Sequence, residues 1–331
     1  MTGLIGVVIP VLDDWESLGA VLADLNAGVQ DGPGFHVIIV DDGSSSEPPD
    51  ELAAVPGTGR IRSLEVIRLA VNLGHQRAIA VGLSAAARRD ELAAVVVMDG
   101  DGEDRPADID ALLAASASRP AHVVLARRAR RSEDWRFRLG YMAYKVLFRI
   151  LTGKVIDFGN FCLLPIGAVR RLVHMPELWN NLAATVIRSR MRTVRVPIDR
   201  GQRVAGRSHM NLPGLIVHGL SAMSVYSDLI FVRVLLGALL VGGLAAVGTL
   251  AVTAVRVATH YAVPGWASTV FGDLVIILMQ TIVMVVATTL IVLNSRSQRP
   301  IVPFADAPAF IADRQQWVRP AHRQDSALVT T

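Results

Sequence analysis

An acidic stretch in the first third of the chain has the clearest chemical potential, and its sequence is Asp99-Gly100-Asp101-Gly102-Glu103-Asp104. It follows the Val-rich apolar run 92–98, which is typical of a strand buried on both faces of a parallel sheet. If strand geometry continues, Asp99 and Asp101 point to the same side. Carboxylates beside flexible glycines suit Mg²⁺ or Mn²⁺ that is also bound by phosphate oxygens. The stretch therefore predicts a metal-diphosphate site.

This stretch has two other interpretations. A solvated acidic turn would show the same residues without any function, and the stretch alone leaves that alternative open. A calcium loop of the EF-hand type would need Gly at its sixth position and Glu at its twelfth. Those positions hold Asp104 and Asp110, and a strand rather than a helix leads in, so the calcium loop is excluded.

The elements before and after this stretch predict an α/β fold. Strand-like runs alternate with helical segments such as 78–88 and 109–116, and the runs cover 4–11, 35–40, 64–69, 92–98 and 122–126. This alternation predicts a doubly wound, mostly parallel sheet, which binds ligands at the carboxyl ends of its strands. The second strand ends in Asp41-Asp42-Gly43-Ser44, which either contacts a ribose or base or forms a plain turn and helix cap.

Length and charge allow an α/β domain of about 200 residues plus a second, apolar part. The chain has 331 residues, 52% of them hydrophobic, a net charge of +4 and one cysteine, Cys162. One cysteine excludes an internal disulfide and fits a reducing compartment, and no signal peptide is expected at the start. Arginines cluster at 127–138 and 188–207. Because they lie near apolar segments rather than in a reader motif, we expect no nucleic-acid partner.

Two uncharged apolar runs, 234–255 and 274–293, are long enough to cross a bilayer. We expect transmembrane helices at 230–257 and 273–294, joined by a short extracytoplasmic loop at 258–272. Arg233, Arg296 and Arg299 flank the pair, and only Arg256 lies at the loop end. The positive-inside rule therefore places residues 1–210 and the tail 295–331 in the cytoplasm, as in a multi-pass protein of the inner (plasma) membrane.

Three further features concern the membrane and assembly. The Arg-rich aromatic segment 135–148 is typical of a helix on the membrane surface, although a plain solvated basic face would explain most of its arginines. The segment 211–229 is expected to lie at the interface. Glycines 237, 242, 243 and 248 in the first apolar run would permit close helix packing, and thus a homo-oligomer.

Four motifs in order resemble the inverting family 2 glycosyltransferases of the GT-A fold. They are Val7-Val8-Ile9-Pro10, Val40-Asp41-Asp42-Gly43-Ser44, Asn72-Leu73-Gly74-His75-Gln76 and Met98-Asp99-Gly100-Asp101. Over residues 4 to 210, the resemblance is to the polyprenyl-phosphate glycosyltransferases. It implies a GT-A domain over 1–210 followed by the hairpin. The implied enzyme transfers one sugar from a UDP- or GDP-linked donor to polyprenyl phosphate, with Mg²⁺ or Mn²⁺, at the cytoplasmic membrane face during cell envelope glycan synthesis.

The resemblance also implies roles for individual residues. Pro10, Asp14, Asp42 and Asp99 match nucleotide-binding positions. The metal positions are Asp99 and Asp101, with Glu103 where Gln is usual. The phosphate-binding positions of donor and acceptor are Arg127, Arg138, Arg203 and Ser208. Of all these, Asp101, Arg127 and Arg203 are the expected catalytic residues.

Three positions depart from the family pattern. Arg207 and His209 stand where Glu and Lys are usual, which puts the acceptor contacts in doubt, and Asn160 replaces an Asp sometimes considered as a base. A lipid phosphate is already anionic and needs positioning rather than deprotonation. Asn160 therefore either favours a phosphate acceptor or only makes a structural hydrogen bond. Transfer to a lipid or glycan hydroxyl, and a non-catalytic nucleotide- or lipid-binding membrane scaffold, stay open as alternatives.

Overall fold

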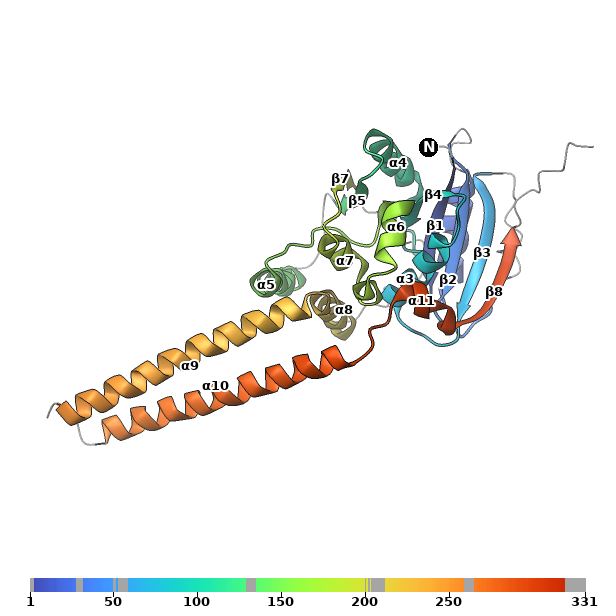
Figure 1. The fold of residues 1–331 in the computed structure, drawn as a ribbon. Helices are drawn as coiled ribbons and strands as arrows, with labels where there is room; N and C mark the ends of the chain where they lie inside the picture. The colour runs from blue at the N-terminus through green and yellow to red at the C-terminus, as the bar shows by residue number, and fades with distance from the viewer. Residues whose placement is uncertain are drawn as a thin grey trace, which may run out of the picture. The chain divides into compact units, whose positions relative to one another are not determined.

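The chain forms two compact units in the computed structural model shown in Figure 1. The sheet unit comprises 1–141, 156–225 and 301–331, and the hairpin unit comprises 142–155 and 226–300. The structure describes residues 3–27, 32–49, 52, 59–128, 135–199, 201, 203, 212–258 and 265–318.

The sheet unit is built on one eight-stranded sheet with the order β7-β5-β6-β4-β1-β2-β3-β8. Four neighbouring pairs are parallel, whereas β6 runs antiparallel to β4 and β5, and β8 runs antiparallel to β3. The mostly parallel α/β sheet predicted from the sequence is thus confirmed. The strands are β1 (Leu4–Val11), β2 (Phe35–Asp41), β3 (Ile61–Leu69), β4 (Leu92–Val97), β5 (Val123–Arg128), β6 (Cys162–Pro165), β7 (Thr193–Ile198) and β8 (Ile311–Val318).

The order of the central strands creates a binding position. From β1 the chain moves outward to β2 and β3, and then returns to place β4 on the other side of β1. The loops leaving β1 and β4 therefore diverge at the carboxyl edge, and such a switch point is where open α/β sheets bind ligands.

Helices cover both faces of the sheet because each face carries a fully apolar cluster. Side chains of α1 (Trp15–Ala27) and α4 (Ile109–Ser118) belong to one cluster, and those of α3 (His75–Ala87), α6 (Ile166–Leu172) and α7 (Leu182–Arg188) belong to the other. Helix α3 packs closely on β1 and β2, since a Cβ added at Gly82 would lie 2.5 Å from Val8 Cγ1. Short 3₁₀ turns lie at Pro106–Asp108, Pro176–Trp179 and Ala307–Phe310.

The C-terminal segment returns to the sheet unit after the hairpin. It forms α11 (Pro303–Asp306) and then β8, which pairs with β3 along an edge of the sheet. The Ser84 hydroxyl donates to the Pro303 carbonyl at 3.1 Å, and Phe304 N–H donates to the Val173 carbonyl at 2.9 Å. The sequence pattern predicts no helix or strand in this segment. The structure shows instead that it completes the sheet.

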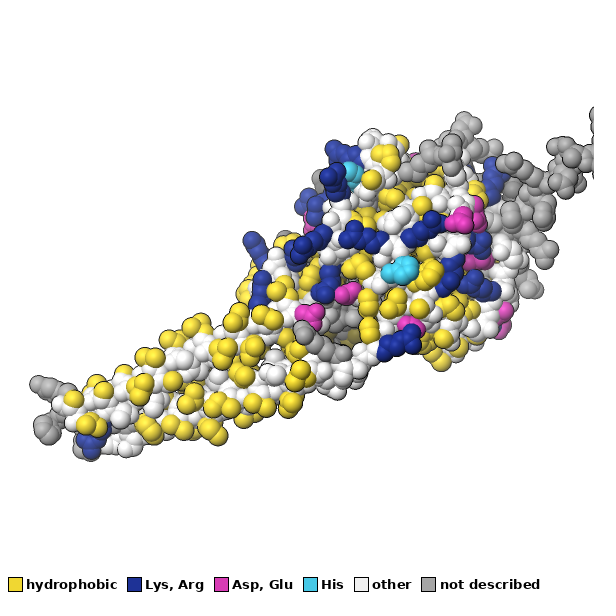
Figure 2. Space-filling view, viewed as in Figure 1, with side chains coloured by type: hydrophobic (Ala, Val, Ile, Leu, Met, Phe, Trp, Pro, Cys, Tyr) yellow, Lys and Arg dark blue, Asp and Glu magenta, His cyan; other side chains and the backbone are white. Residues whose placement is uncertain are grey.

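The hairpin unit contains two helices long and apolar enough to cross a membrane, α9 (Ser227–Ala258) and α10 (Trp266–Ser297). Both extend beyond the predicted spans 230–257 and 273–294. Their apolar side chains are exposed, with Leu240 at 65% and Leu250 at 71%, and these side chains dominate the helix surfaces in Figure 2. Gly242 approaches Thr281, so this glycine serves packing within the hairpin.

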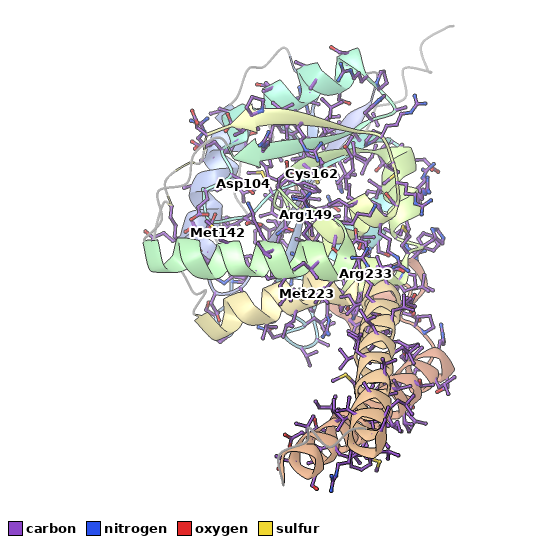
Figure 3. The ribbon with its side chains drawn as sticks, turned by 90° about the vertical axis from the view of Figure 1, so that its left-hand side faces the viewer. Asp104, Met142, Arg149, Cys162, Met223 and Arg233 are labelled. Atoms are coloured by element: carbon purple, nitrogen blue, oxygen red, sulfur yellow. The ribbon has the colours of Figure 1, made fainter. Side chains whose placement is uncertain are left out.

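Two more helices are α5 (Trp135–Thr152), which is divided between the two units, and α8 (Leu212–Ser224), which belongs to the sheet unit. Residues of α5 from Met142 onward belong to the hairpin unit, where the Arg233 guanidinium donates to the Ile150 carbonyl. Figure 3 labels Met142 and Arg149 on α5. Met142 and Ile150 are 61% and 63% exposed although they are apolar, which is typical of a surface that contacts lipid or another apolar partner.

Candidate active site

Acidic loops meet at the carboxyl edge of the sheet. Asp14 follows β1, Asp42 follows β2, and Asp99 and Asp101 follow β4. Because β1 and β4 are neighbours at the switch point, Asp14 and Asp101 are joined through a common partner described below. The carboxylates that the sequence singles out thus occupy the position at which this fold binds ligands.

The loop after β4 is held by its own hydrogen bonds. Strand β4 ends at Val97, so the alternation expected to align Asp99 with Asp101 does not continue. Instead, Asp99 N–H donates to Asp104 Oδ2 at 3.0 Å, and Glu103 N–H donates to Asp101 Oδ1 at 3.0 Å. Gly102 has a φ of 83°, a conformation that favours glycine. The loop shape therefore depends on Asp104, a residue that our sequence reasoning did not consider for the site.

Asp104 has a buried place beneath the loop. Its side chain is 5% exposed, and Figure 3 shows it near Cys162 of β6. Burial, with a further contribution from the Asp104 charge, raises the pKa of the Cys162 thiol. The thiol therefore stays protonated and unreactive at neutral pH.

Negative charge accumulates around Asp101. Burial raises the pKa of Asp101, and the charges of Asp99 and Glu103 raise it further, while the Glu103 N–H and Arg203 act in the opposite direction. Within the described residues, no three His, Cys, Asp or Glu side chains form a ready-made metal cage. Mg²⁺ commonly uses only one or two carboxylates and takes its other ligands from phosphates and water. The repelling carboxylates of this loop fit such a cation.

Arg203 connects the loops of β1 and β4. Its guanidinium lies 2.9 Å from Asp14 Oδ2 and 3.6 Å from Asp101 Oδ2, and all three side chains are only about 20% exposed. Gly201 N–H donates to the Glu103 carbonyl at 2.9 Å, and a Cβ at Gly201 would lie 2.5 Å from the Gly102 carbonyl oxygen. The segment after β7 is therefore docked tightly on the acidic loop and brings a cation to it.

Asp42 anchors the loop that precedes α3. Its two carboxylate oxygens accept from Leu73 N–H at 2.7 Å and Gly74 N–H at 2.9 Å, and the side chain is 3% exposed. Burial raises the pKa of Asp42 although these hydrogen bonds and His75 lower it. Pro10 is buried in β1 opposite Val40. Pro10 and Asp42, two of the nucleotide positions predicted from the resemblance, are thus both buried at the carboxyl edge.

His75, at the start of α3, lies directly against the acidic loop. Its Nε2 is 3.2 Å from Asp99 Oδ1 and 3.0 Å from Asn160 Nδ2, and the amide of Gln76 donates to Asn160 Oδ1 at 3.0 Å. Removal from water lowers the pKa of His75, but Asp99, Asp42 and Asp101 outweigh that effect, so the pKa is raised. His75 belongs to one of the four motifs, but the sequence alone assigns it no role.

Arg127 is at the end of β5 and is 60% exposed, with its Nε 3.7 Å from Asp157 Oδ2. Asp157 also pairs with Arg195 of β7 at 3.2 Å. The neighbouring Ala126 instead lines a small pocket beside the acidic loop, so strand alternation directs Arg127 to the opposite face of the sheet. The pocket is lined by Glu103, Asp104, Ala126, Gly159, Phe161, Ile198 and Asp199.

The structure does not describe the side chains of four positions named in the sequence analysis. Arg138 lies in α5, but its side chain is not described. Ser208, Arg207 and His209 fall outside the described residues altogether. Their predicted roles in phosphate binding therefore stay predictions.

Comparisons with known proteins show what this chain is similar to. The chain is 28% identical over 220 residues to an undecaprenyl-phosphate 4-deoxy-4-formamido-L-arabinose transferase of Edwardsiella ictaluri, and 31% identical over 227 residues to that of Serratia proteamaculans. Each match covers 64% of this chain and spans 64% of the relative's length.

Among solved structures, a crystal structure of glucosyl-3-phosphoglycerate synthase from Mycobacterium tuberculosis, in complex with Mn²⁺, uridine diphosphate and phosphoglyceric acid, matches with a TM-score of 0.49 and 16% identity. That match covers 69% of this chain and 78% of the other. The family model described as "Glycosyl transferase family 2" matches residues 6–173, just over half of the chain and all of the acidic edge. The chain belongs to glycosyl transferase family 2.

Proposed function

We propose that this protein is an inverting, metal-dependent glycosyltransferase that moves one sugar from a nucleotide diphosphate donor to polyprenyl phosphate at the cytoplasmic face of the membrane. One observation carries the proposal. The acidic loops of β1 and β4 meet at the switch point of a family 2 sheet, with a cationic side chain, Arg203, between them. A diphosphate held through a divalent cation needs carboxylates of this kind.

The donor side is assigned to the acidic loop. Asp99 and Asp101, with Glu103, would hold Mg²⁺ or Mn²⁺, which supplies charge neutralisation for the departing nucleoside diphosphate. Asp14, Asp42 and Pro10 would border the nucleoside, with Asp42 acting mainly by fixing the backbone of Leu73 and Gly74. Either a UDP- or a GDP-linked sugar is compatible with these residues.

The acceptor side is assigned to the arginines. Arg203 lies at the acidic loop and would contact donor or acceptor phosphate, together with Arg138 and Ser208. Arg127 points to the other face of the sheet, so it would have to contact a phosphate from that face. Asn160 cannot accept a proton, and both polar atoms of its side chain are engaged by Gln76 and His75. An anionic phosphate nucleophile needs no base at that position. The relatives' names, which contain undecaprenyl phosphate, support an acceptor of this class.

The hairpin supports a membrane topology for the protein. Two helices of membrane-crossing length, with the arginines of the sequence concentrated outside the connecting loop, support a cytoplasmic sheet unit in the inner membrane. We assign residues 1–210 to catalysis and 211–229 to the interface, and we place 258–272 outside the cytoplasm. The segment 295–331 stays on the catalytic side, consistent with β8 pairing in the sheet unit.

A turnover screen tests the proposal. The full chain in detergent is incubated with Mg²⁺ or Mn²⁺, a short polyprenyl phosphate and a panel of UDP- and GDP-sugars, and lipid products are identified by mass spectrometry. We expect one sugar-phosphate-lipid with inverted anomeric configuration that disappears with EDTA. A product formed only on a lipid or glycan hydroxyl would contradict the acceptor assignment, and donor binding without any turnover would favour a non-catalytic scaffold.

A further inference from the structure

Asp13 joins the loop after β1 to the loop after β2. Its Oδ1 atom accepts from the backbone N–H groups of Ser45 at 2.8 Å and Ser46 at 3.0 Å, and from the Ser46 hydroxyl at 3.0 Å. The Ser45 hydroxyl, 3.1 Å from both carboxylate oxygens, donates as well. These four donors match the number of hydrogen bonds that a carboxylate can accept, so all of them form together. The Asp13 N–H in turn donates to the Ser44 hydroxyl at 2.9 Å.

Asp42 joins the next pair of loops in the same way. In both cases a carboxylate placed just after one strand accepts from two consecutive N–H groups in the loop after the neighbouring strand. The loops after β1, β2 and β3 are thus connected in series at the carboxyl edge. The two links differ in burial, because Asp42 is buried whereas Asp13, Ser45 and Ser46 are exposed. Water can therefore replace Asp13 as a partner without leaving a buried polar group unpaired.

The link made by Asp13 also fixes the position of Asp14. Asp13 has a φ of 51°, in the left-handed region that Asp and Asn tolerate better than most side chains. On the other side of Asp14, the Trp15 indole N–H donates to the Ser46 carbonyl at 3.1 Å. Asp14 therefore lies between two residues that are both bonded to the loop after β2. Its own carboxylate is left to meet Arg203 at 2.9 Å.

We propose that Asp13 is a positioning residue for the donor nucleotide, because it joins the loops after β1 and β2 and so holds Asp14 and Asp42 in place before the nucleotide binds. The inference rests on the proposed function, in which Asp14 and Asp42 border the nucleoside. Without the link, the two loops have to be ordered when the nucleotide binds. The apparent affinity then falls by the fraction of molecules in which the loops are already joined.

Calorimetric binding of UDP and of GDP, each with Mn²⁺, to the full chain in detergent tests the proposal. Asp13→Gly adopts a positive φ at no steric cost but removes every side-chain acceptor, and we expect it to weaken nucleotide binding by about tenfold. Asp13→Asn also tolerates this backbone, and its carbonyl oxygen still accepts from both N–H groups, so the affinity should stay within about threefold of the unsubstituted protein. Asp90→Ala, which removes an exposed carboxylate paired with Arg170 before β4, is the matched control and should change nothing.

Three further measurements separate positioning from loss of the fold. Amide hydrogen exchange in the segment that contains Ser45 and Ser46 should be faster in Asp13→Gly than in Asp13→Asn. Thermal unfolding of Asp13→Gly should be nearly unchanged, because the lost bonds lie at the surface. In turnover assays the KM for the donor should rise in Asp13→Gly, whereas kcat at saturating donor should not fall.

The outcomes distinguish this inference from the proposed function. Unchanged nucleotide affinity in Asp13→Gly would overturn the inference alone. So would an equal loss in Asp13→Asn, which would assign the effect to charge, or a loss of affinity matched by a loss of thermal stability, which would assign it to folding. Failure of the unsubstituted protein to bind either nucleotide would overturn the donor assignment in the proposed function, and this inference with it.

Discussion

Polar and charged residues lie at both ends of the central strands, at the carboxyl edge and at the amino edge of the sheet, but in different environments. At the carboxyl edge, Asp14, Asp101 and Arg203 are about 20% exposed and linked to each other. Near the amino ends of β2 and β3, His36 and Ser63 are 1% and 3% exposed, and Glu65, in the middle of β3, is 5% exposed. There, His36 Nδ1 contacts the Ser63 hydroxyl, and Arg89 pairs with Glu65.

This difference separates binding from stability. A charged group that keeps some contact with water can exchange a protein partner for a phosphate or a metal, because water solvates the group both before and after the exchange. Groups that are fully buried have no such alternative, and any change of charge there opposes folding. Substitutions at the carboxyl edge should therefore affect turnover, and those at the amino edge should affect unfolding.

The largest expected effect is at Asp101. Asp101→Asn removes a metal-binding charge but keeps the shape of the side chain, and we expect turnover to fall by about 1,000-fold, or about 4 kcal/mol of transition-state stabilisation. Stability should not fall, because the substitution relieves repulsion from Asp99 and Glu103. Product formation and thermal unfolding of the same preparation check both statements. Full turnover with unchanged metal dependence would remove Asp101 from the site.

The second effect concerns His36 and pH. Burial, and then the nearby Arg89 charge, lower the pKa of His36 from 6.5 to about 4, while Glu91 acts in the opposite direction. The pKa of His36 is lower in the folded protein than in the unfolded chain, so between pH 6.5 and 4 only the unfolded chain binds the proton. The free energy of unfolding is therefore unaffected by His36 above pH 6.5 and falls as the pH drops towards 4. A shift of this size corresponds to about 3 kcal/mol.

Denaturant unfolding of the unsubstituted protein and of His36→Gln at several pH values measures this loss. The stability difference between the two should change by about 3 kcal/mol in favour of the variant between about pH 7 and about pH 4. Turnover of His36→Gln at neutral pH should be unchanged. A difference that does not vary with pH would show that the imidazole is not held neutral in the core.

A third prediction tests the core between the two edges. A Cβ at Gly82 would lie 2.5 Å from Val8 and 2.9 Å from Val40, both in strands that cannot move independently. Gly82→Ala should lower the free energy of unfolding by about 2 kcal/mol through overpacking, despite the better helix propensity of Ala. Gly167→Ala, at a glycine of α6 with open space around it, is the control and should not destabilise. Equal stability of both variants would contradict the close packing of α3.

The smallest expected effect is at Arg105, because we expect that not every charge at the carboxyl edge serves the site. Arg105 pairs with Asp108 at 2.8 Å, three residues further along, and is 46% exposed. Arg105→Gln should change stability by less than about 0.5 kcal/mol and turnover by less than about twofold. Loss of turnover comparable to that of Asp101→Asn would mean that the functional edge extends beyond Asp14, Asp101 and Arg203.

The amino-acid sequence predicts the parts of this edge that depend on local pattern. The buried run before Asp99 marks β4 because a strand inside a parallel sheet must be apolar on both faces. The same argument locates β1 and β2, and with them the loops that carry Asp14 and Asp42. The two helices long and apolar enough to cross a membrane are predicted from length and hydropathy alone.

The remaining features depend on contacts between distant segments, and local pattern does not reveal them. Arg203 meets Asp14 across 189 positions in the chain, and the Gln76–Asn160 bond spans 84. Strand β8 is rich in polar and charged residues because it covers an edge of the sheet, so its sequence lacks the apolar run of a central strand. Asp104 looks like one more acid of an acidic loop until its burial beneath Asp99 is known.

The most direct test of the central claim is calorimetric binding of UDP with and without Mn²⁺, compared among the unsubstituted protein, Asp101→Asn and His36→Gln. If the carboxyl edge holds the donor through a metal, UDP binding requires Mn²⁺ in the unsubstituted protein and in His36→Gln, and it is lost in Asp101→Asn. Equal UDP binding without Mn²⁺, or in Asp101→Asn, would contradict the assignment of this edge as a metal-dependent donor site.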